Sequence, residues 1–273
     1  MSNRNNQQNK QAARERLRAE RERQAKRDKT RRQLFVAGAI VVVLAIAGGV
    51  GYAVTNMKDD KGGSGWAGDK PLVKPANTTG ENGDEIVIGD AKAKETLTVY
   101  EDPRCPSCAA FENESGAQLR QDVKDGRYKA RFVMVNFIDD LSQGTGSKNA
   151  VSALGAALNV SPDAFVAYKE ALYSPKNHPD ERDDAFAKDA RLIEIAQQVP
   201  ALKGNKAFEK AVNEGTYDTW AVEMGKLFEK NKIGGTPSLL HGDKKLTGPD
   251  GKNPPMAKPS FIAAIDKEFG PKK

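Results

Sequence analysis

The longest run of apolar positions lies near the N-terminus of the chain. Residues 34–57 hold 24 positions without a charged side chain. About 20 apolar residues in a helix span the hydrocarbon core of a bilayer, which is about 30 Å thick. The pattern therefore predicts one transmembrane helix over 34–57. The stretch after it, 58–84, is rich in Gly, Pro, Asn and charge and has no periodicity, which predicts a flexible linker.

Beyond residue 84 the pattern changes to short apolar segments. Residues 84–89 and 95–102 are rich in β-branched and aromatic side chains, which is typical of strands. Residues 128–138 alternate and then become continuously apolar, as expected of a strand buried within a sheet. Three strands are therefore predicted in the first half of the folded region.

The segment between the second and third of these strands has the spacing of a helix. Over residues 107–126 we expect Phe111, Leu119 and Val123 to face the core. Gly116 interrupts this helix and predicts a weak point or a kink.

Residues 140–232 show helical periodicity and no convincing strand. Ser161 and Pro162 form an N-cap and first-turn pair. Two apolar stripes repeat at helical spacing, namely Leu192, Ile195, Ala196 and Val199, and Trp220, Met224, Leu227 and Phe228. The letters PSLLHG and KKLTG then predict a short hairpin, and a last helix ends at Gly270. The order is β, β, α, β, a helical block, β, β, α.

The net charge of +6 is divided unevenly along the chain. Residues 1–32 hold twelve Lys and Arg against four Asp and Glu, so the remainder is slightly acidic. Basic residues mark the cytoplasmic side of a transmembrane helix, so the tail 1–33 is expected in the cytoplasm and everything after residue 57 outside. This role explains the charge without nucleic-acid binding. A cleaved or twin-arginine signal is the alternative, but the long basic region and the lack of a clear cleavage site favour an uncleaved anchor.

The sequence VYEDPRCPSCAAFE contains the two cysteines of the chain, Cys105 and Cys108. A structural zinc site needs about four ligands, and only His178 and His241 are left to supply them, without a ligand spacing. A structural disulfide is natural outside the membrane, but a loop of about four residues stabilises less than a longer one. A redox pair is the third interpretation, and the neighbouring residues favour it.

Cys105 falls at the N-terminus of the predicted helix, where unpaired N–H groups and the macrodipole favour a thiolate. Pro106 suits the first helical position, and Arg104 adds positive charge. The spacing of i and i+3 brings the two sulfurs together, so a disulfide closes without backbone rearrangement. We therefore expect an exposed, reactive Cys105 and a buried Cys108, with Arg104, Pro106 and Ser107 supporting the pair.

With this motif, residues 86–269 resemble the DsbA-like thiol:disulfide oxidoreductases, a family of thioredoxin fold. The second matching motif is GGTPS, residues 234–238, just before the late hairpin. The resemblance implies an α/β thioredoxin fold over 85–273 with a helical insertion at about 140–232. It also implies that Pro237 is a cis-proline facing the cysteines and that the backbone of Thr236 pairs with substrate. An ordinary helix end and turn is the alternative for GGTP.

The chain departs from the family pattern at two places. The family often has a buried acidic residue six positions before the first cysteine, where this chain has Val99. Glu101 and Asp102 are nearer to the cysteine, and they either have another role or cap the helix. The dipeptide between the cysteines is Pro-Ser where strong oxidants of the family often have Pro-His. The reaction type follows from the resemblance, whereas the redox strength does not.

These features predict a single-pass protein of the cell membrane with its catalytic domain outside. It would exchange a Cys105–Cys108 disulfide with exported proteins that carry thiols, without a cofactor or a metal. A quinone-linked membrane protein is expected to reoxidise the pair, the lipid bilayer holds the anchor, and no nucleic acid is involved. A disulfide-forming oxidase is the favoured activity. A reductase or isomerase, for example in cytochrome or copper-site maturation, and a non-catalytic binding or chaperone module are the alternatives.

Overall fold

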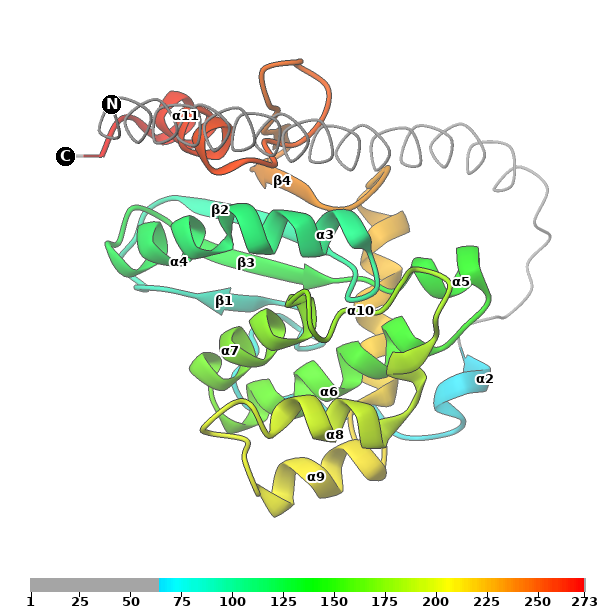
Figure 1. The fold of residues 1–273 in the computed structure, drawn as a ribbon. Coiled ribbons are helices and arrows are strands. Elements are labelled where there is room, and N and C mark those ends of the chain that lie inside the picture. Colours follow the sequence, from blue (N-terminus) through cyan, green and yellow to red (C-terminus); the bar gives the residue numbers. More distant parts are fainter. Residues whose placement is uncertain (1–63, 273) are drawn as a thin grey trace, which may run out of the picture. The chain divides into compact units, whose positions relative to one another are not determined.

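The computed structural model describes residues 64–272 (Figure 1). The predicted cytoplasmic tail, 1–33, and the predicted transmembrane helix, 34–57, lie outside the described residues. Within 64–272, no helix combines the length and the apolar character needed to cross a membrane.

A mixed five-stranded sheet forms the centre of the described region, in the order β1-β3-β2-β4-β5. The strands are β1 (Ile86–Ile88), β2 (Thr96–Glu101), β3 (Lys129–Met134), β4 (Ser238–His241) and β5 (Lys244–Lys245). Strands β2 and β3 run parallel, and the other neighbours are antiparallel. All residues of β2 except the first are buried, in keeping with its central place. The predicted strands and late hairpin are confirmed, with narrower bounds.

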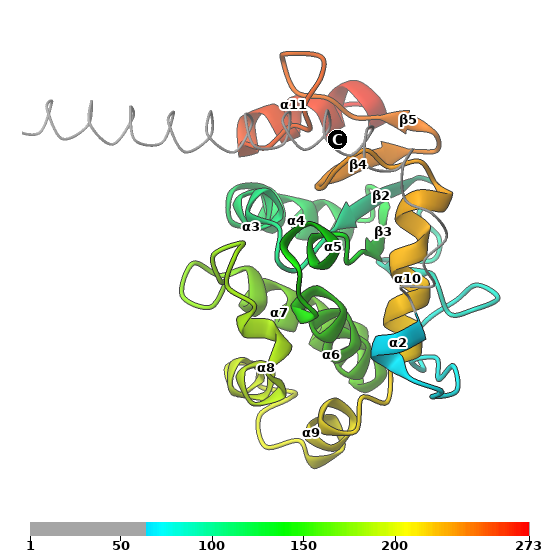
Figure 2. The same cartoon turned by 90° about the vertical axis from the view of Figure 1, so that its right-hand side faces the viewer.

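Helices cover both faces of this sheet (Figures 1 and 2). One continuous helical segment comprises α3 (Pro106–Phe111), η1 (Glu112–Gly116) and α4 (Ala117–Lys124). The C-terminal helix α11 (Lys258–Phe269) packs beside it, and the rings of Phe111 and Phe261 meet edge to face at 5.7 Å. The predicted core positions Leu119 and Val123 are buried as well.

The weak point predicted at Gly116 is a π-helical turn, η1. A Cβ atom at this position would lie 2.5 Å from the carboxylate of Glu112, which occupies the space beside the glycine. A charged residue such as Glu112 is expected on the exposed side of a helix. The wider turn instead allows the Glu112 side chain to point into the protein, where it is buried.

The helical insertion forms its own layer on one side of the sheet (Figures 1 and 2). Its elements are α5 (Ile138–Ser142), α6 (Gly146–Val160), α7 (Pro162–Tyr173), η2 (Ala185–Ala187), α8 (Asp189–Ala196) and α9 (Lys206–Asn213). The predicted cap of α7 is confirmed, because the Ser161 hydroxyl accepts a hydrogen bond from the backbone N–H of Ala164 at 3.0 Å. Phe165 of α7 reaches the sheet and packs against Phe132.

The last helix of the predicted insertion, α10 (Asp218–Lys230), also covers the sheet. The side-chain amide of Asn136 donates to the carbonyl of Ala221 at 3.0 Å, and that of Asn231 donates to the Tyr100 hydroxyl at 2.9 Å. Helix α10 therefore packs against the sheet as well as against the helical block. Its amphipathic pattern does not distinguish the two, because both surfaces are apolar.

The flexible linker predicted over 58–84 is wrong for its described part, residues 64–84. A short helix, α2 (Ser64–Ala67), packs against α10. The Lys70 ammonium pairs with Asp218 at 2.8 Å, and the indole N–H of Trp220 donates to the Gly83 carbonyl at 2.7 Å. The side-chain amide of Asn77 donates to the Leu158 carbonyl at 2.8 Å. Polar contacts with distant partners hold the segment, and these leave no periodicity in a sequence.

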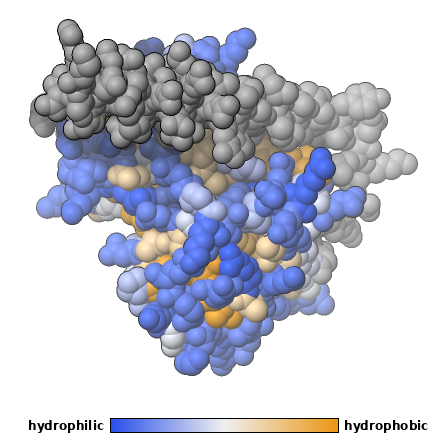
Figure 3. Space-filling model, viewed as in Figure 1, coloured by the Kyte–Doolittle hydropathy of each residue, from blue (hydrophilic) through white to orange (hydrophobic). Residues whose placement is uncertain are grey.

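Apolar side chains of the sheet and of the insertion form one continuous core. On the face shown in Figure 3 the described surface is mostly hydrophilic, with small apolar areas over the helical layer. Among the described residues, the exposed large apolar side chains are those of Leu72, Val73, Leu141 and Val160.

Candidate active site

The two cysteines lie between the end of β2 and the first turn of α3. Cys105 is the N-cap residue of α3, with an extended backbone, and Pro106 occupies the first helical position. Both cysteines are free thiols. Cys108 is fully buried, and Cys105 is only 5% exposed, so the expectation of an exposed Cys105 is wrong. Both cysteines pack in one buried cluster with Ile138 and Tyr173, which belong to the insertion and cover the thiols.

The second motif lies directly against the first. The peptide bond between Thr236 and Pro237 is cis, as the family resemblance implies. The Cys105 thiol donates to the carbonyl oxygen of Thr236 at 3.5 Å. Residues 131 positions apart in the chain are thus brought together, because β4, which starts at Ser238, pairs with β2.

The two thiols have opposite electrostatic surroundings. Hydrogen bonding from the Cys108 thiol lowers the pKa of Cys105, burial opposes this, and the Thr236 side chain lowers it further. Burial raises the pKa of Cys108 well above its usual value, and the hydrogen bond to Cys105 and the charge of Glu101 add to the effect. Cys105 is therefore the thiol suited to act as a nucleophile, and Cys108 holds its proton.

Of the three residues expected to support the cysteines, two occupy the first turn of α3 and one does not. Pro106 is exposed at the first helical position, and Ser107 is nearly buried behind it. Arg104, in contrast, is fully buried, and its guanidinium forms ion pairs with Asp139 and Asp184, both at 2.9 Å. Two carboxylates match its charge, so the expected effect of Arg104 on the thiolate is replaced by a structural one.

Asp102 does not cap α3, which was one of the two roles considered for it. Its buried carboxylate accepts hydrogen bonds from the backbone N–H of Ile138 at 3.0 Å and of Arg104 at 2.9 Å, and from the Ser147 hydroxyl at 2.7 Å. Burial raises the pKa of Asp102 to about 7, although these three hydrogen bonds lower it. Asp102 therefore connects the segment before Cys105 to the start of the insertion.

A second buried group of charged side chains surrounds Lys169. The ammonium of Lys169, on α7, contacts Glu101 at 2.9 Å and Glu112 at 2.6 Å, and Arg120 also pairs with Glu112. Burial raises the pKa of Glu101 more than Lys169 lowers it. Glu101 thus supplies a buried acidic residue, while Val99 is buried in the sheet.

Lys169 and Tyr173 were missed by the sequence analysis. A signal was present, because both residues lie on the same helical stripe as Phe165, at i+4 and i+8. A lysine on the apolar stripe of a helix indicates a buried partner. Its partners Glu101 and Glu112 are distant in the chain, so the pattern does not identify them.

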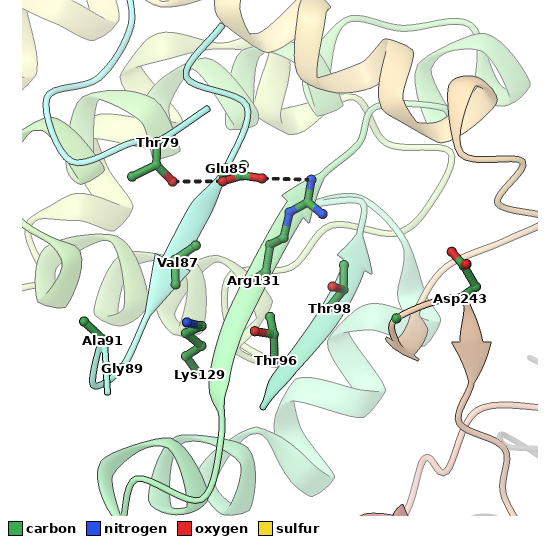
Figure 4. Close-up of a pocket in the computed structure, with 11 residues that line it drawn as sticks. Thr79, Glu85, Val87, Gly89, Ala91, Thr96, Thr98, Lys129, Arg131 and Asp243 are labelled. Atoms are coloured by element: carbon green, nitrogen blue, oxygen red, sulfur yellow. Dashed lines mark hydrogen bonds and ion pairs between the residues drawn. The ribbon is translucent and has the colours of Figure 1, made fainter. Parts of the chain in front are cut away.

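The structure also has a groove on the uncovered part of the sheet, away from the thiols (Figure 4). Its lining includes Thr96, Lys129 and Arg131 near the start of β2 and β3, and Glu85 beside Arg131. Cys105 follows the opposite end of β2. The groove therefore belongs to a different part of the molecule from the two motifs.

Comparison with known proteins supports the arrangement described above. A family model described as Thioredoxin matches residues 81–255, more than half of the chain. The serine/threonine-protein kinase PknE of Mycobacterium tuberculosis is 27% identical over 188 residues, which cover 67% of this chain and 31% of the kinase. The chain therefore spans about a third of the length of that relative. Disulfide bond formation protein D of Bacillus subtilis is 26% identical over 161 residues, 59% of this chain and 68% of that protein.

Solved structures share the fold. Oxidised DsbA of Mycobacterium tuberculosis superposes with a TM-score of 0.55 and 23% identity, over 68% of this chain and 93% of that one. Oxidised BdbD of Bacillus subtilis superposes with a TM-score of 0.56 and 22% identity, over 72% of this chain and 99% of that one. MdbA of Actinomyces oris, described as a thiol-disulfide oxidoreductase, superposes with a TM-score of 0.53 and 19% identity, over 68% of this chain and 88% of that one.

In its fold, its cysteine pair and the cis-proline beside that pair, the chain resembles the DsbA-like thiol:disulfide oxidoreductases. The predicted resemblance and enzyme class are confirmed at this level. The chain belongs to the thioredoxin family.

Proposed function

We propose that this protein exchanges a Cys105–Cys108 disulfide with substrate proteins, as a disulfide-forming oxidase. The observation that carries the proposal is the inequality of the two thiols. Cys105 starts a helix against Thr236 and has a lowered pKa, whereas the pKa of Cys108 is raised by burial. One thiol is thereby suited to form a mixed disulfide and the other to resolve it.

In the oxidase direction, a substrate thiolate attacks the sulfur of Cys105. The Cys105–Cys108 bond breaks, its electron pair goes to Cys108, and a mixed disulfide joins Cys105 to the substrate. A second substrate thiolate then attacks the substrate sulfur and releases Cys105 as a thiolate. The substrate loses two electrons and gains a disulfide, and the protein gains the two electrons as a pair of thiols.

The direction follows from the thiolate. Stabilising the Cys105 thiolate favours the reduced protein, and a protein that favours its reduced form oxidises its substrates. Burial of Cys105 and the charge of Asp102 oppose this stabilisation, which supports an oxidant of intermediate strength. A reductase or isomerase would need a reduction potential below that of its substrates.

The location and partners belong to the same proposal. Residues 34–57 anchor the protein in the cell membrane, and the basic residues before them keep the N-terminus in the cytoplasm. The thioredoxin domain then works outside, on exported proteins with thiols, where disulfides persist. A quinone-linked membrane protein returns the pair to the disulfide.

The test uses the oxidised full chain with a reduced peptide that carries two cysteines. We expect the wild type to convert the peptide to its disulfide and Cys105→Ser to abolish the reaction. Reduced Cys108→Ser, mixed instead with the oxidised peptide, should accumulate a mixed disulfide through Cys105, because its thiolate attacks the peptide disulfide and the resolving thiol is missing. A chaperone or binding module would keep its effect on unfolded proteins after Cys105→Ser. Full peptide oxidation by Cys105→Ser would overturn the proposal.

A further inference from the structure

The step that breaks the internal disulfide produces a thiolate on Cys108, in a place that is unfavourable for charge. Cys108 is fully buried, and the negative charge of Glu101 lies near it. The nearby ammonium, that of Lys169, is engaged by Glu101 at 2.9 Å and by Glu112 at 2.6 Å. A buried thiolate without a partner is costly, so the exchange needs a hydrogen-bond donor at this sulfur.

Tyr173, the last residue of α7, has such a donor. It packs in the same buried cluster as Cys105 and Cys108 and is only 1% exposed. Its hydroxyl is buried and has no hydrogen-bond partner among residues 64–272. Burial raises the pKa of Tyr173, and the charges of Glu101, Cys108 and Asp102 raise it further, so the phenol keeps its proton.

The ring of Tyr173 is held in place from several sides. The Lys169 ammonium lies 5.2 Å from the ring centroid, and the His178 ring stacks at 6.0 Å. The backbone carbonyl of Tyr173 accepts a hydrogen bond from the Asn113 side chain at 2.8 Å, which ties the end of α7 to the helix of the cysteines. The hydroxyl hydrogen can still rotate, because only the ring is fixed.

We propose that the Tyr173 hydroxyl donates a hydrogen bond to the Cys108 thiolate during thiol–disulfide exchange. The inference rests on the proposed function and adds a residue of the helical insertion to its chemistry. When the substrate thiolate attacks Cys105, the electron pair of the broken bond goes to Cys108, and the phenol stabilises that charge while keeping its own proton. Solvent later protonates Cys108. In the reverse direction, the same hydrogen bond holds the Cys108 thiolate as it attacks the mixed disulfide.

The test compares rates of exchange in the full chain, with dithiothreitol as reductant and oxidised glutathione as oxidant. Tyr173→Phe keeps the ring and removes the hydroxyl. We expect the rate constants of reduction and of oxidation to fall together by about tenfold, since one hydrogen bond to a charged group is lost in the transition state. The reduction potential should stay unchanged, because the Cys108 thiolate, which the hydrogen bond stabilises, is absent from both the disulfide form and the fully reduced form.

Tyr168→Phe is the matched control. Tyr168 lies on the same helix and is equally buried, but its hydroxyl donates to the Leu192 carbonyl at 2.9 Å, away from the cysteines. This variant should lose thermal stability and keep both rate constants. In a Cys105→Ser chain, Tyr173→Phe should also raise the pH at which Cys108 becomes reactive toward iodoacetamide.

Failure of this inference is distinct from failure of the proposed function. A wild-type chain that does not exchange disulfides would overturn both. Exchange in the wild type with equal rate constants in Tyr173→Phe would overturn the role of Tyr173 alone. A change of the reduction potential without a common fall in both rates would indicate a structural role and would also contradict the inference.

Discussion

At the scale of single residues, the chemistry depends on how differently two identical side chains are placed. Cys105 and Cys108 are one helical turn apart, yet one pKa is lowered and the other raised. The cause is the position of the two thiols at the helix start: hydrogen bonding from the Cys108 thiol lowers the pKa of Cys105, and the Thr236 side chain lowers this pKa further, against the effect of burial. The buried Thr236 hydroxyl makes no hydrogen bond within the described part of the chain, so it is free to turn to the thiolate.

This arrangement predicts the effect of removing that hydroxyl. Thr236→Val should make Cys105 less acidic, because one donor to the thiolate is lost. We expect the rate of Cys105 alkylation by iodoacetamide at pH 7 to fall by roughly threefold to tenfold. Thr236→Ser keeps the hydroxyl and should resemble the wild type. Equal alkylation profiles for Val and Ser at this position would contradict the assignment.

Arg104 is the residue whose role changes most between sequence and structure. Its buried guanidinium pairs with Asp139, whose carboxylate also accepts from the backbone N–H of Ser147 and Lys148 at the start of α6. It pairs with Asp184 as well, which accepts from the backbone N–H of Gly146 at 2.9 Å. The residue before Cys105 therefore ties the redox motif to the first turn of the insertion.

Arg104→Met should leave the buried Asp139 with only the more distant ammonium of Lys148, 4.0 Å away, as a counter-charge. Breaking a buried ion pair by removing one partner costs about 3 to 5 kcal/mol, so we expect a loss of that size in the free energy of unfolding, measured with urea. Arg191→Met breaks an exposed pair with Glu194 and should cost less than about 1 kcal/mol. A similar small loss for both variants would show that the buried pair does not stabilise the fold.

At the scale of elements, the π turn η1 explains how Glu112, a charged residue of a helix, comes to form a buried ion pair. Glu112 reaches Lys169 because the turn is wide and because Gly116 leaves room for its carboxylate. Burial raises the pKa of Glu112, but Lys169 and Arg120 lower it by more, so the carboxylate stays charged. The turn, the glycine and the ion pair depend on one another.

Gly116→Ala should therefore destabilise the protein although alanine favours helices. The added methyl group would collide with Glu112, at a cost of about 1 to 3 kcal/mol. The control is the same substitution in a Glu112→Ala chain, where the space is free and the helix preference of alanine should dominate. Equal effects of Gly116→Ala in both chains, measured by thermal unfolding, would exclude the proposed collision.

At the scale of the whole molecule, His241 joins three distant segments. It lies on β4, and its two ring nitrogens contact Glu268 of α11 at 2.9 Å and Glu95 before β2 at 2.8 Å. Hydrogen bonds to Glu268 and Glu95 raise the pKa of His241, despite partial burial. The protonated ring therefore links the C-terminal helix to the sheet.

The sign of the pH dependence follows from the raised pKa. The folded protein binds this proton more tightly than the unfolded chain, so the contribution is fully present below about pH 6.5. It is lost as the pH rises through the higher pKa of the folded state. The free energy of unfolding, measured with urea, should fall less between pH 6 and pH 9 in His241→Gln than in the wild type. A larger loss in the variant would contradict this linkage.

The sequence by itself determined the strands, the break at Gly116, the capped start of α7 and the two motifs around Cys105 and Pro237. Each of these follows from neighbouring residues, through side-chain alternation, capping chemistry or motif spacing. The sequence could not identify which charged side chains form ion pairs. Glu101 and Lys169 are 68 positions apart, and nothing in their neighbours pairs them.

Only the tertiary structure decided the surroundings of the thiols. The insertion places Ile138 and Tyr173 in one buried cluster with the two cysteines, and Cys105, which its position at the helix start predicted to be exposed, is buried. The same packing neutralises Arg104 and attaches residues 64–84 to α10. Burial and charge pairing depend on partners that lie far away in the chain, and these partners meet only when the sheet and the helical insertion have packed together.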